Sequence, residues 1–182
     1  MFSLPCRRSI RLQEYDYSKT GIYYVTLYAQ NRELLFEDNN IKNVIEKHWL
    51  NIPENFKNIE LDRWVVMPNH LHGIIVIVGA IHESPACETI NEYATRNERA
   101  IRELPLPENR RKMLLPRIIG KFKMNSSKEI NILLNRSGQK LWQRNYYEHI
   151  IRNQKSLDKI RTYIKNNPGN WDKDRNNPKN WK

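Results

Sequence analysis

Two histidines separated by one residue are the first candidates for chemistry in this chain. His70 and His72 open an apolar, β-branched run that continues to Ile77, and Pro68-Asn69 before them is a turn signal. Because alternate residues of a strand point to the same face, both imidazoles are expected on one face of a sheet. Two neutral imidazoles side by side form half of a divalent-metal site, but a bare His-x-His fits two surface histidines equally well.

A second pair of candidates lies on the last predicted helix. On a helical wheel, Tyr163 and Asn167 lie one above the other at one edge of an apolar stripe, because they are four residues apart. Two imidazole nitrogens and an amide oxygen would hold Mg²⁺ or Mn²⁺ with positions open for phosphate oxygens. Such an ion acts as a Lewis acid on the phosphate. A tyrosine hydroxyl, which ordinarily loses its proton only near pH ~10, could then attack the phosphorus and conserve the bond energy in a phosphotyrosine.

The spacing of apolar residues predicts the elements that position these side chains. The first six predicted elements match the βαββαβ pattern of ferredoxin-like and RRM-like proteins, so the expected fold class is α+β with a C-terminal helix carrying Tyr163. The predicted order is a strand over 21–29, a helix from about 41, strands over 59–67 and 70–78, a helix from about 115, a strand over 141–151 and a helix over 155–167.

Composition restricts the partners and the compartment. The net charge of +11 favours a polyanion, either nucleic acid or an anionic membrane surface. The longest apolar run, 74–78, is too short to span a bilayer, and the two cysteines form no C-x-x-C pair. We therefore expect a cytoplasmic protein of one domain over 1–182 that faces nucleic acid. Its predicted appendages are a basic arm over 7–20, a variable and partly disordered segment over 79–111 and a tail over 169–182.

Basic residues elsewhere are candidates for contacts with DNA. Several lysines lie along the helix predicted from about residue 115. They either contact DNA phosphates or form an ordinary solvated face. His149 could be a further metal ligand, a phosphate contact or a structural residue. The residues we assign to DNA binding are Lys121, Lys123, Arg144, His149 and Arg152.

Two blocks of the sequence resemble a known family. Met67-Pro68-Asn69-His70-Leu71-His72-Gly73 resembles the HUH motif of the single-tyrosine, IS200-like transposases. Trp142–Asn153 followed by Thr162–Pro168 resembles the branch associated with repetitive extragenic palindromes (REP), as does the start Arg8-Ser9-Ile10-Arg11-Leu12. The resemblance covers most of the chain outside 79–111.

The resemblance implies a fold, a reaction and a substrate. The fold would be the HUH endonuclease core, and Tyr163 would attack a single-stranded DNA phosphate to leave a 5′-phosphotyrosine and a free 3′-OH. His70 and His72 would bind the metal, and Asn167 would take the place of a glutamine in insertion-sequence relatives. The substrates would be single-stranded DNA hairpins from palindromic repeats or element ends. Members of the family work as monomers or homodimers.

Other readings of the same residues remain open. Tyr146 and Tyr147 are rival nucleophiles, although one of two adjacent strand residues must face the core and neither has a polar residue four positions later. A binding module of RRM-like topology without chemistry is a second function, but His-Leu-His stands where such modules present aromatic residues. A zinc hydrolase is a third, and it lacks a third close His, Cys or acidic ligand.

Overall fold

A four-stranded antiparallel sheet with the strand order β2-β3-β1-β4 forms the centre of the protein. The strands are β1 (Gly21–Tyr28), β2 (Ile59–Met67), β3 (His70–Ile77) and β4 (Tyr147–Ile151). The computed structural model describes residues 15–78 and 113–181, so most of the predicted arm and the segment over 79–111 lie outside it. This order and these pairings are those of the ferredoxin-like pattern, which confirms the predicted α+β class.

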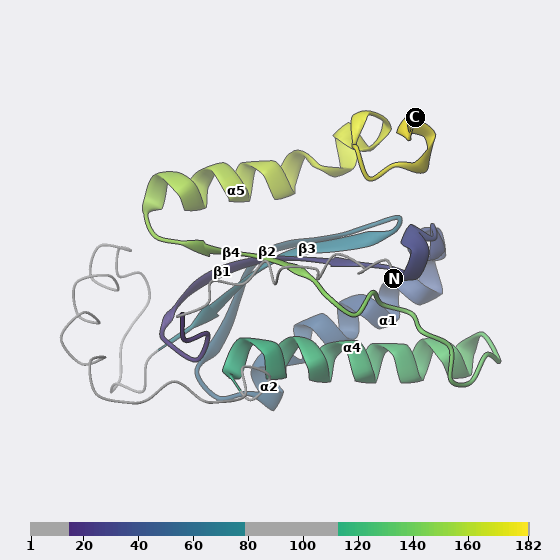
Figure 1. Ribbon diagram of the computed structural model, residues 1–182, viewed down its shortest axis with the longest axis horizontal. Coiled ribbons are helices and arrows are strands. Elements are labelled where there is room, and N and C mark those ends of the chain that lie inside the picture. The colour runs from purple at the N-terminus through teal and green to yellow at the C-terminus, as the bar shows by residue number, and fades with distance from the viewer. Residues whose placement is uncertain (1–14, 79–112, 182) are drawn as a thin grey trace, which may run out of the picture.

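Helices cover both faces of the sheet (Figure 1). α1 (Asn39–Leu50), α2 (Ile52–Asn55) and α4 (Leu114–Leu133) lie on one side, and α5 (Gln154–Asn166) lies on the other. Short 3₁₀ segments complete the fold: η1 (Gln30–Arg32) and η2 (Leu35–Glu37) after β1, and η4 (Pro168–Lys173) and η5 (Pro178–Asn180) after α5. No helix in the described part of the chain is long and apolar enough to cross a bilayer.

The main hydrophobic core lies between the sheet and the α1–α4 layer, and it explains the glycine that follows the two histidines. Trp49 of α1 is fully buried and packs edge-on against Phe122 of α4. A Cβ atom on Gly73 would lie 2.2 Å from Cζ2 of the Trp49 ring. Only glycine lets the indole approach β3 so closely, because any side chain at this position would clash with the ring.

The predicted strand over 141–151 is too long, since β4 begins at Tyr147. Trp142 forms only an isolated bridge with Ala29, and its indole N–H donates to Ser126 Oγ at 3.0 Å. Lys123 Nζ lies 2.9 Å from the Gln143 carbonyl oxygen and 3.3 Å from that of Asn145, so a lysine occupies acceptors that a strand would offer to its neighbour. The polar residues in this stretch therefore form a connection between α4 and the sheet edge.

α5 covers only part of the opposite sheet face. Its N-terminus is capped by Asn153, whose Oδ1 accepts from Ser156 N at 2.8 Å. A smaller apolar cluster fixes it to the sheet, and Arg161 adds an ion pair to Asp62 of β2 at 2.7 Å. The buried members of this apolar cluster are Ile22, Tyr24, Ile74, Ile151, Leu157 and Ile164. Polar and aromatic side chains line the remainder of this sheet face.

Candidate active site

The two histidines of β3 meet on the sheet face that α5 covers. Both are buried, and their Nε2 atoms lie 2.9 Å apart. Leu71 between them is fully buried in the core on the other face, as the alternation along a strand requires. The predicted common face of His70 and His72 is therefore confirmed.

The outer nitrogen of the His70 ring is held by the residue before it. Asn69 Oδ1 lies 2.7 Å from His70 Nδ1. Asn69 Nδ2 donates to the carbonyl oxygens of Arg32 at 3.2 Å and Asn176 at 2.8 Å, which fixes the orientation of its amide. Because an amide oxygen only accepts, His70 carries its proton on Nδ1, and the lone pair of Nε2 points toward His72.

His72 is held by two hydroxyls of the neighbouring strand. Tyr24 Oη lies 2.7 Å and Thr26 Oγ1 lies 2.9 Å from His72 Nδ1. Thr26 is the direct register partner of His72, so the pairing of β1 with β3 places these groups. Either hydroxyl oxygen can accept a hydrogen bond from Nδ1–H and so hold the tautomer in which Nε2 is free to bind a metal ion.

Burial keeps both imidazoles neutral. It lowers the pKa of His70 to about 4, an effect that Asp174 partly offsets and Arg32 reinforces. It lowers the pKa of His72 well below its usual value, and His70 and Arg175 lower it further. Burial also raises the pKa of Tyr24, so its hydroxyl keeps its proton at neutral pH. Neutral imidazole is the form that binds metal ions.

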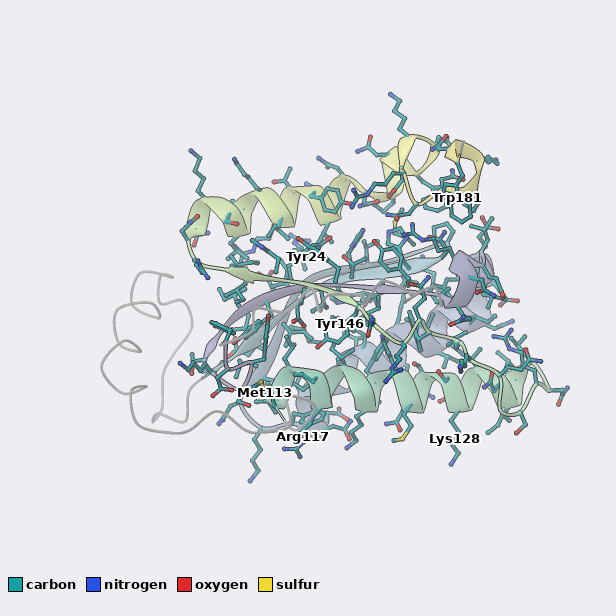
Figure 2. The ribbon with its side chains drawn as sticks, viewed as in Figure 1. Tyr24, Met113, Arg117, Lys128, Tyr146 and Trp181 are labelled. Carbon is teal, nitrogen blue, oxygen red and sulfur yellow. The ribbon has the colours of Figure 1, made fainter. Side chains whose placement is uncertain are left out.

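α5 brings the predicted nucleophile to the histidines. Tyr163 Oη lies 3.4 Å from His72 Nε2, and 48% of the tyrosine is exposed. His72, Tyr163 and Asn167 line one cavity of about 1050 Å³ between the sheet and α5. Figure 2 shows Tyr24 in the same layer. Tyr163 and Asn167, which the helical spacing predicted to lie together at one edge of the apolar stripe, therefore share a cavity with His72.

Asn167 is buried at the end of α5, where its side chain makes no capping bond to η4. The similar Asn177 ten residues later does cap, because its Oδ1 accepts from Lys179 N at 3.1 Å. The two Asn-Pro turns of the tail therefore use their asparagines differently. The amide of Asn167 remains available to the cavity.

The C-terminal tail forms one wall of this cavity. Asn176 accepts from Arg32 Nη1 at 2.5 Å, and its carbonyl oxygen accepts from Asn69, which ties the tail to the turn before His70. The Trp171 ring lies 6.1 Å from the His70 ring. Asp174 and Arg175 also line the cavity. Sequence reasoning missed these tail residues and also Tyr24, Thr26 and Asn69 as partners of the histidines.

The residues predicted to bind DNA lie outside the main cavity. Lys121, Lys123 and Arg144 line a separate hollow of about 760 Å³ that α4 helps to form, together with Arg117, which points away from the sheet in Figure 2. His149 and Arg152 line a smaller hollow of about 430 Å³ beside β4. The cations in the main cavity are instead Lys159, Lys173 and Arg175, which the sequence did not single out.

The rival tyrosines lie on opposite sides of the sheet. Tyr146 is buried on the α4 side, as Figure 2 shows, and Lys123 lies 5.3 Å from its ring centroid. Tyr147 is 42% exposed and lines the main cavity. The expectation that one of the two faces the core is confirmed. Of the three candidate nucleophiles, Tyr163 is the one whose hydroxyl lies 3.4 Å from His72 Nε2.

The donor set fits an octahedral divalent ion. Two adjacent ligands of such an ion, each about 2.1 Å from it, lie about 3 Å apart, and the two Nε2 atoms lie 2.9 Å apart. The described residues contain no group of three or more His, Cys, Asp or Glu side chains suited to a metal. The predicted third ligand, Asn167, is an amide that lines the same cavity as His72.

Comparison with known proteins identifies the family. The chain is 36% identical over 176 residues to an uncharacterized protein of Haemophilus influenzae, covering 92% of this chain and 91% of that protein. The family described as "Transposase IS200 like" matches residues 105–167, which include α4, β4 and α5. The chain belongs to the IS200-like transposase family. It is therefore grouped with enzymes that cleave DNA.

A solved structure shares the fold of this IS200-like chain. A REP-associated tyrosine transposase bound to a REP hairpin superposes with a TM-score of 0.57 at 18% identity, covering 88% of this chain and 73% of that one. At this identity the likeness concerns the fold. The predicted family resemblance and the predicted HUH fold are both confirmed.

Proposed function

We propose that this protein is a single-strand DNA endonuclease and strand transferase that works through a 5′-phosphotyrosine. The observation that carries the proposal is the position of Tyr163. This half-exposed tyrosine lines the cavity, and its hydroxyl lies 3.4 Å from Nε2 of His72, one of two buried, neutral histidines. A nucleophile beside a metal-binding pair is the arrangement that phosphoryl transfer needs. Family membership supports a DNA-cleaving role.

The reaction consists of an exchange of two ester bonds. Tyr163 Oη attacks the phosphorus and loses its proton, the bond from phosphorus to the 3′ oxygen breaks, and that oxygen takes up a proton to become a free 3′-OH. The 5′ end remains joined to Tyr163. Attack by a 3′-OH on the phosphotyrosine reverses the exchange and rejoins a strand, so no external energy source is required.

His70, His72 and Asn167 would hold Mg²⁺ or Mn²⁺, which would supply Lewis-acid polarisation of the phosphate. The chain's own contribution is to keep the donors in place before the ion arrives. Asn69 holds the ring of His70, and the hydroxyls of Tyr24 and Thr26 hold the ring of His72. Outer-sphere partners of this kind fix the tautomer and orientation of the ligands.

The substrate we propose is single-stranded DNA that carries a hairpin. The net charge of +11 favours nucleic acid, and the main cavity combines tyrosines with the cations Lys159, Lys173 and Arg175. The hairpin named for the REP-associated neighbour supports this choice. The basic hollow beside α4 and the hollow beside β4 would contact phosphates outside the cavity through Lys121, Lys123, Arg144, His149 and Arg152.

A covalent-adduct assay tests the proposal. Labelled hairpin oligonucleotides with single-stranded flanks, taken from palindromic repeats near the gene, are incubated with the protein and Mg²⁺ or Mn²⁺ and separated on a denaturing gel. We expect an adduct that is lost with EDTA and in Tyr163→Phe but kept in the control Tyr146→Phe. An adduct in Tyr163→Phe would refute the nucleophile. Tight hairpin binding by the native protein without any adduct would favour the alternative, a binding protein without catalysis.

A further inference from the structure

Three residues from three strands form one row across the sheet face of the cavity. Thr26 of β1 pairs in register with His72 of β3 on one side and with Tyr147 of β4 on the other. Residues in register share a face, and neighbouring strands lie about 4.8 Å apart. Tyr147 therefore lies about two strand spacings from His72, roughly 10 Å along the row.

Tyr147 presents an aromatic surface that the protein leaves open. It is 42% exposed, although β4 places it beside the buried Tyr24, whose ring centroid lies 6.2 Å away in an edge-on arrangement. Tyr24 also meets Tyr163 edge-on, with ring centroids 6.5 Å apart. The two exposed rings thus flank Tyr24 and face the same cavity.

The cavity and the hollow beside β4 meet at Tyr147, since this residue lines both. Lys159 is on the cavity side, one helical turn before Tyr163 on α5, and Arg152 is on the β4 side. A DNA strand whose phosphates pass Tyr163 and leave the cavity at Tyr147 would meet Lys159 before Tyr147 and Arg152 after it. Cations along a path with an exposed aromatic ring are the features of a site for single-stranded nucleic acid.

We propose that Tyr147 is a stacking platform for one unpaired nucleobase next to the scissile phosphate, with Lys159 on the phosphate beside it. The proposal rests on the proposed function in that the ligand is single-stranded DNA. A base stacked on Tyr147 would fix the strand in the cavity and so select which phosphate reaches Tyr163. Stacking is tolerant of base identity, because every base has an aromatic face.

Combining a change of Tyr147 with removal of single bases from the DNA tests the stacking contact. Binding of a fluorescent hairpin oligonucleotide with a single-stranded flank is measured by anisotropy in EDTA, with Tyr163→Phe as the parent so that no cleavage intervenes. Each flank nucleotide is replaced in turn by an abasic nucleotide. We expect one position at which base removal weakens binding by the parent about tenfold. Tyr147→Ala in the same parent should bind the intact oligonucleotide about tenfold more weakly and lose no further affinity at that position.

Two matched variants separate stacking from structural damage. Tyr147→Phe keeps the ring and should reproduce the abasic profile of the parent. Lys159→Ala should weaken binding and reduce its salt dependence more than Lys155→Ala, which removes the same charge one turn earlier on α5, outside the main cavity.

The outcomes distinguish this proposal from the proposed function. The same abasic profile in the parent and in Tyr147→Ala would overturn the stacking site, even if the native protein forms the covalent adduct. A Tyr147-dependent position without any adduct from the native protein would support the stacking site and refute the cleavage mechanism. No measurable binding of any oligonucleotide by the parent would overturn both.

Discussion

The hydroxyl of Tyr24 lies 2.7 Å from Nδ1 of His72, on the side of the ring opposite the nitrogen that faces His70. Thr26 adds a second hydroxyl at 2.9 Å from the same atom. The direction in which His72 presents its metal-binding nitrogen therefore depends on β1 as well as on β3.

Removing these hydroxyls should weaken metal binding. Loss of an outer-sphere partner of a histidine ligand typically costs about 10–100-fold in affinity, so we expect about a tenfold loss of Mn²⁺ affinity in Tyr24→Phe and a larger loss in Tyr24→Phe/Thr26→Val. Free Mn²⁺ is measured by electron paramagnetic resonance. Tyr23→Phe is the matched control, because its hydroxyl donates to Lys19 O at 2.8 Å on the other face of the same strand. Equal losses in Tyr24→Phe and Tyr23→Phe would assign the effect to folding.

Replacing Asn167 should weaken Mn²⁺ binding, whereas replacing the adjacent Asn166 should not. Asn167→Ala removes the proposed amide ligand and should weaken Mn²⁺ binding at least tenfold, whereas Asn167→Asp keeps an oxygen donor and should retain it. Asn166→Ala, an exposed change one residue earlier, is the control. Native Mn²⁺ affinity in Asn167→Ala would show that the third ligand lies elsewhere.

The buried histidines should make folding sensitive to acid. His70 has a folded-state pKa of about 4, below the usual 6.5, so the unfolded chain takes up a proton first as the pH falls. The stability from neutral His70 is fully present above about pH 6.5 and is lost as the pH falls to about 4, a change of roughly 3 kcal/mol at about 1.4 kcal/mol per pKa unit. Urea unfolding without metal at pH 7.5, 5.5 and 4 measures it.

Replacing single histidines separates the contribution of His70 to acid sensitivity from that of other titrating groups. His70→Gln should lose less stability between pH 7.5 and 4 than the native protein, whereas His149→Gln, at an exposed site on β4, should keep the native loss. A loss in His70→Gln as large as that of the native protein would contradict the assignment.

Gly73 and Trp49 should be energetically coupled. Gly73→Ala places a methyl group 2.2 Å from the Trp49 ring, an overpacking that costs typically about 1–3 kcal/mol of stability. The clashing atoms belong to the six-membered ring of the indole, so Trp49→Phe should make room for the methyl group. We expect Gly73→Ala/Trp49→Phe to be more stable than the sum of the two single changes predicts, as measured by urea unfolding. If the losses of unfolding free energy in the two single variants simply add in the double variant, strand β3 moves to accommodate the methyl group and the indole ring does not limit it.

The sequence alone was sufficient for the order of the main elements and for the faces on which His70, His72 and Tyr163 lie. Alternation along a strand put His70 and His72 on one face, and helical periodicity put Tyr163 above Asn167, because both patterns depend only on local backbone geometry. The reaction was implied by the family resemblance and not by these patterns. The end of the last predicted strand was correct, but its start was not, because Lys123 of α4 binds the carbonyls of the preceding segment.

Only the tertiary structure decided which residues surround the histidines. The register of β1 against β3 brings Tyr24 and Thr26 to His72, and the folded tail brings Asn176 to Asn69 from more than a hundred residues away. Sequence spacing carries no information about such contacts, since they depend on strand pairing and on where the chain returns. The same reason explains why the predicted DNA-binding cations lie in other hollows, while Lys159 and Arg175 line the cavity itself.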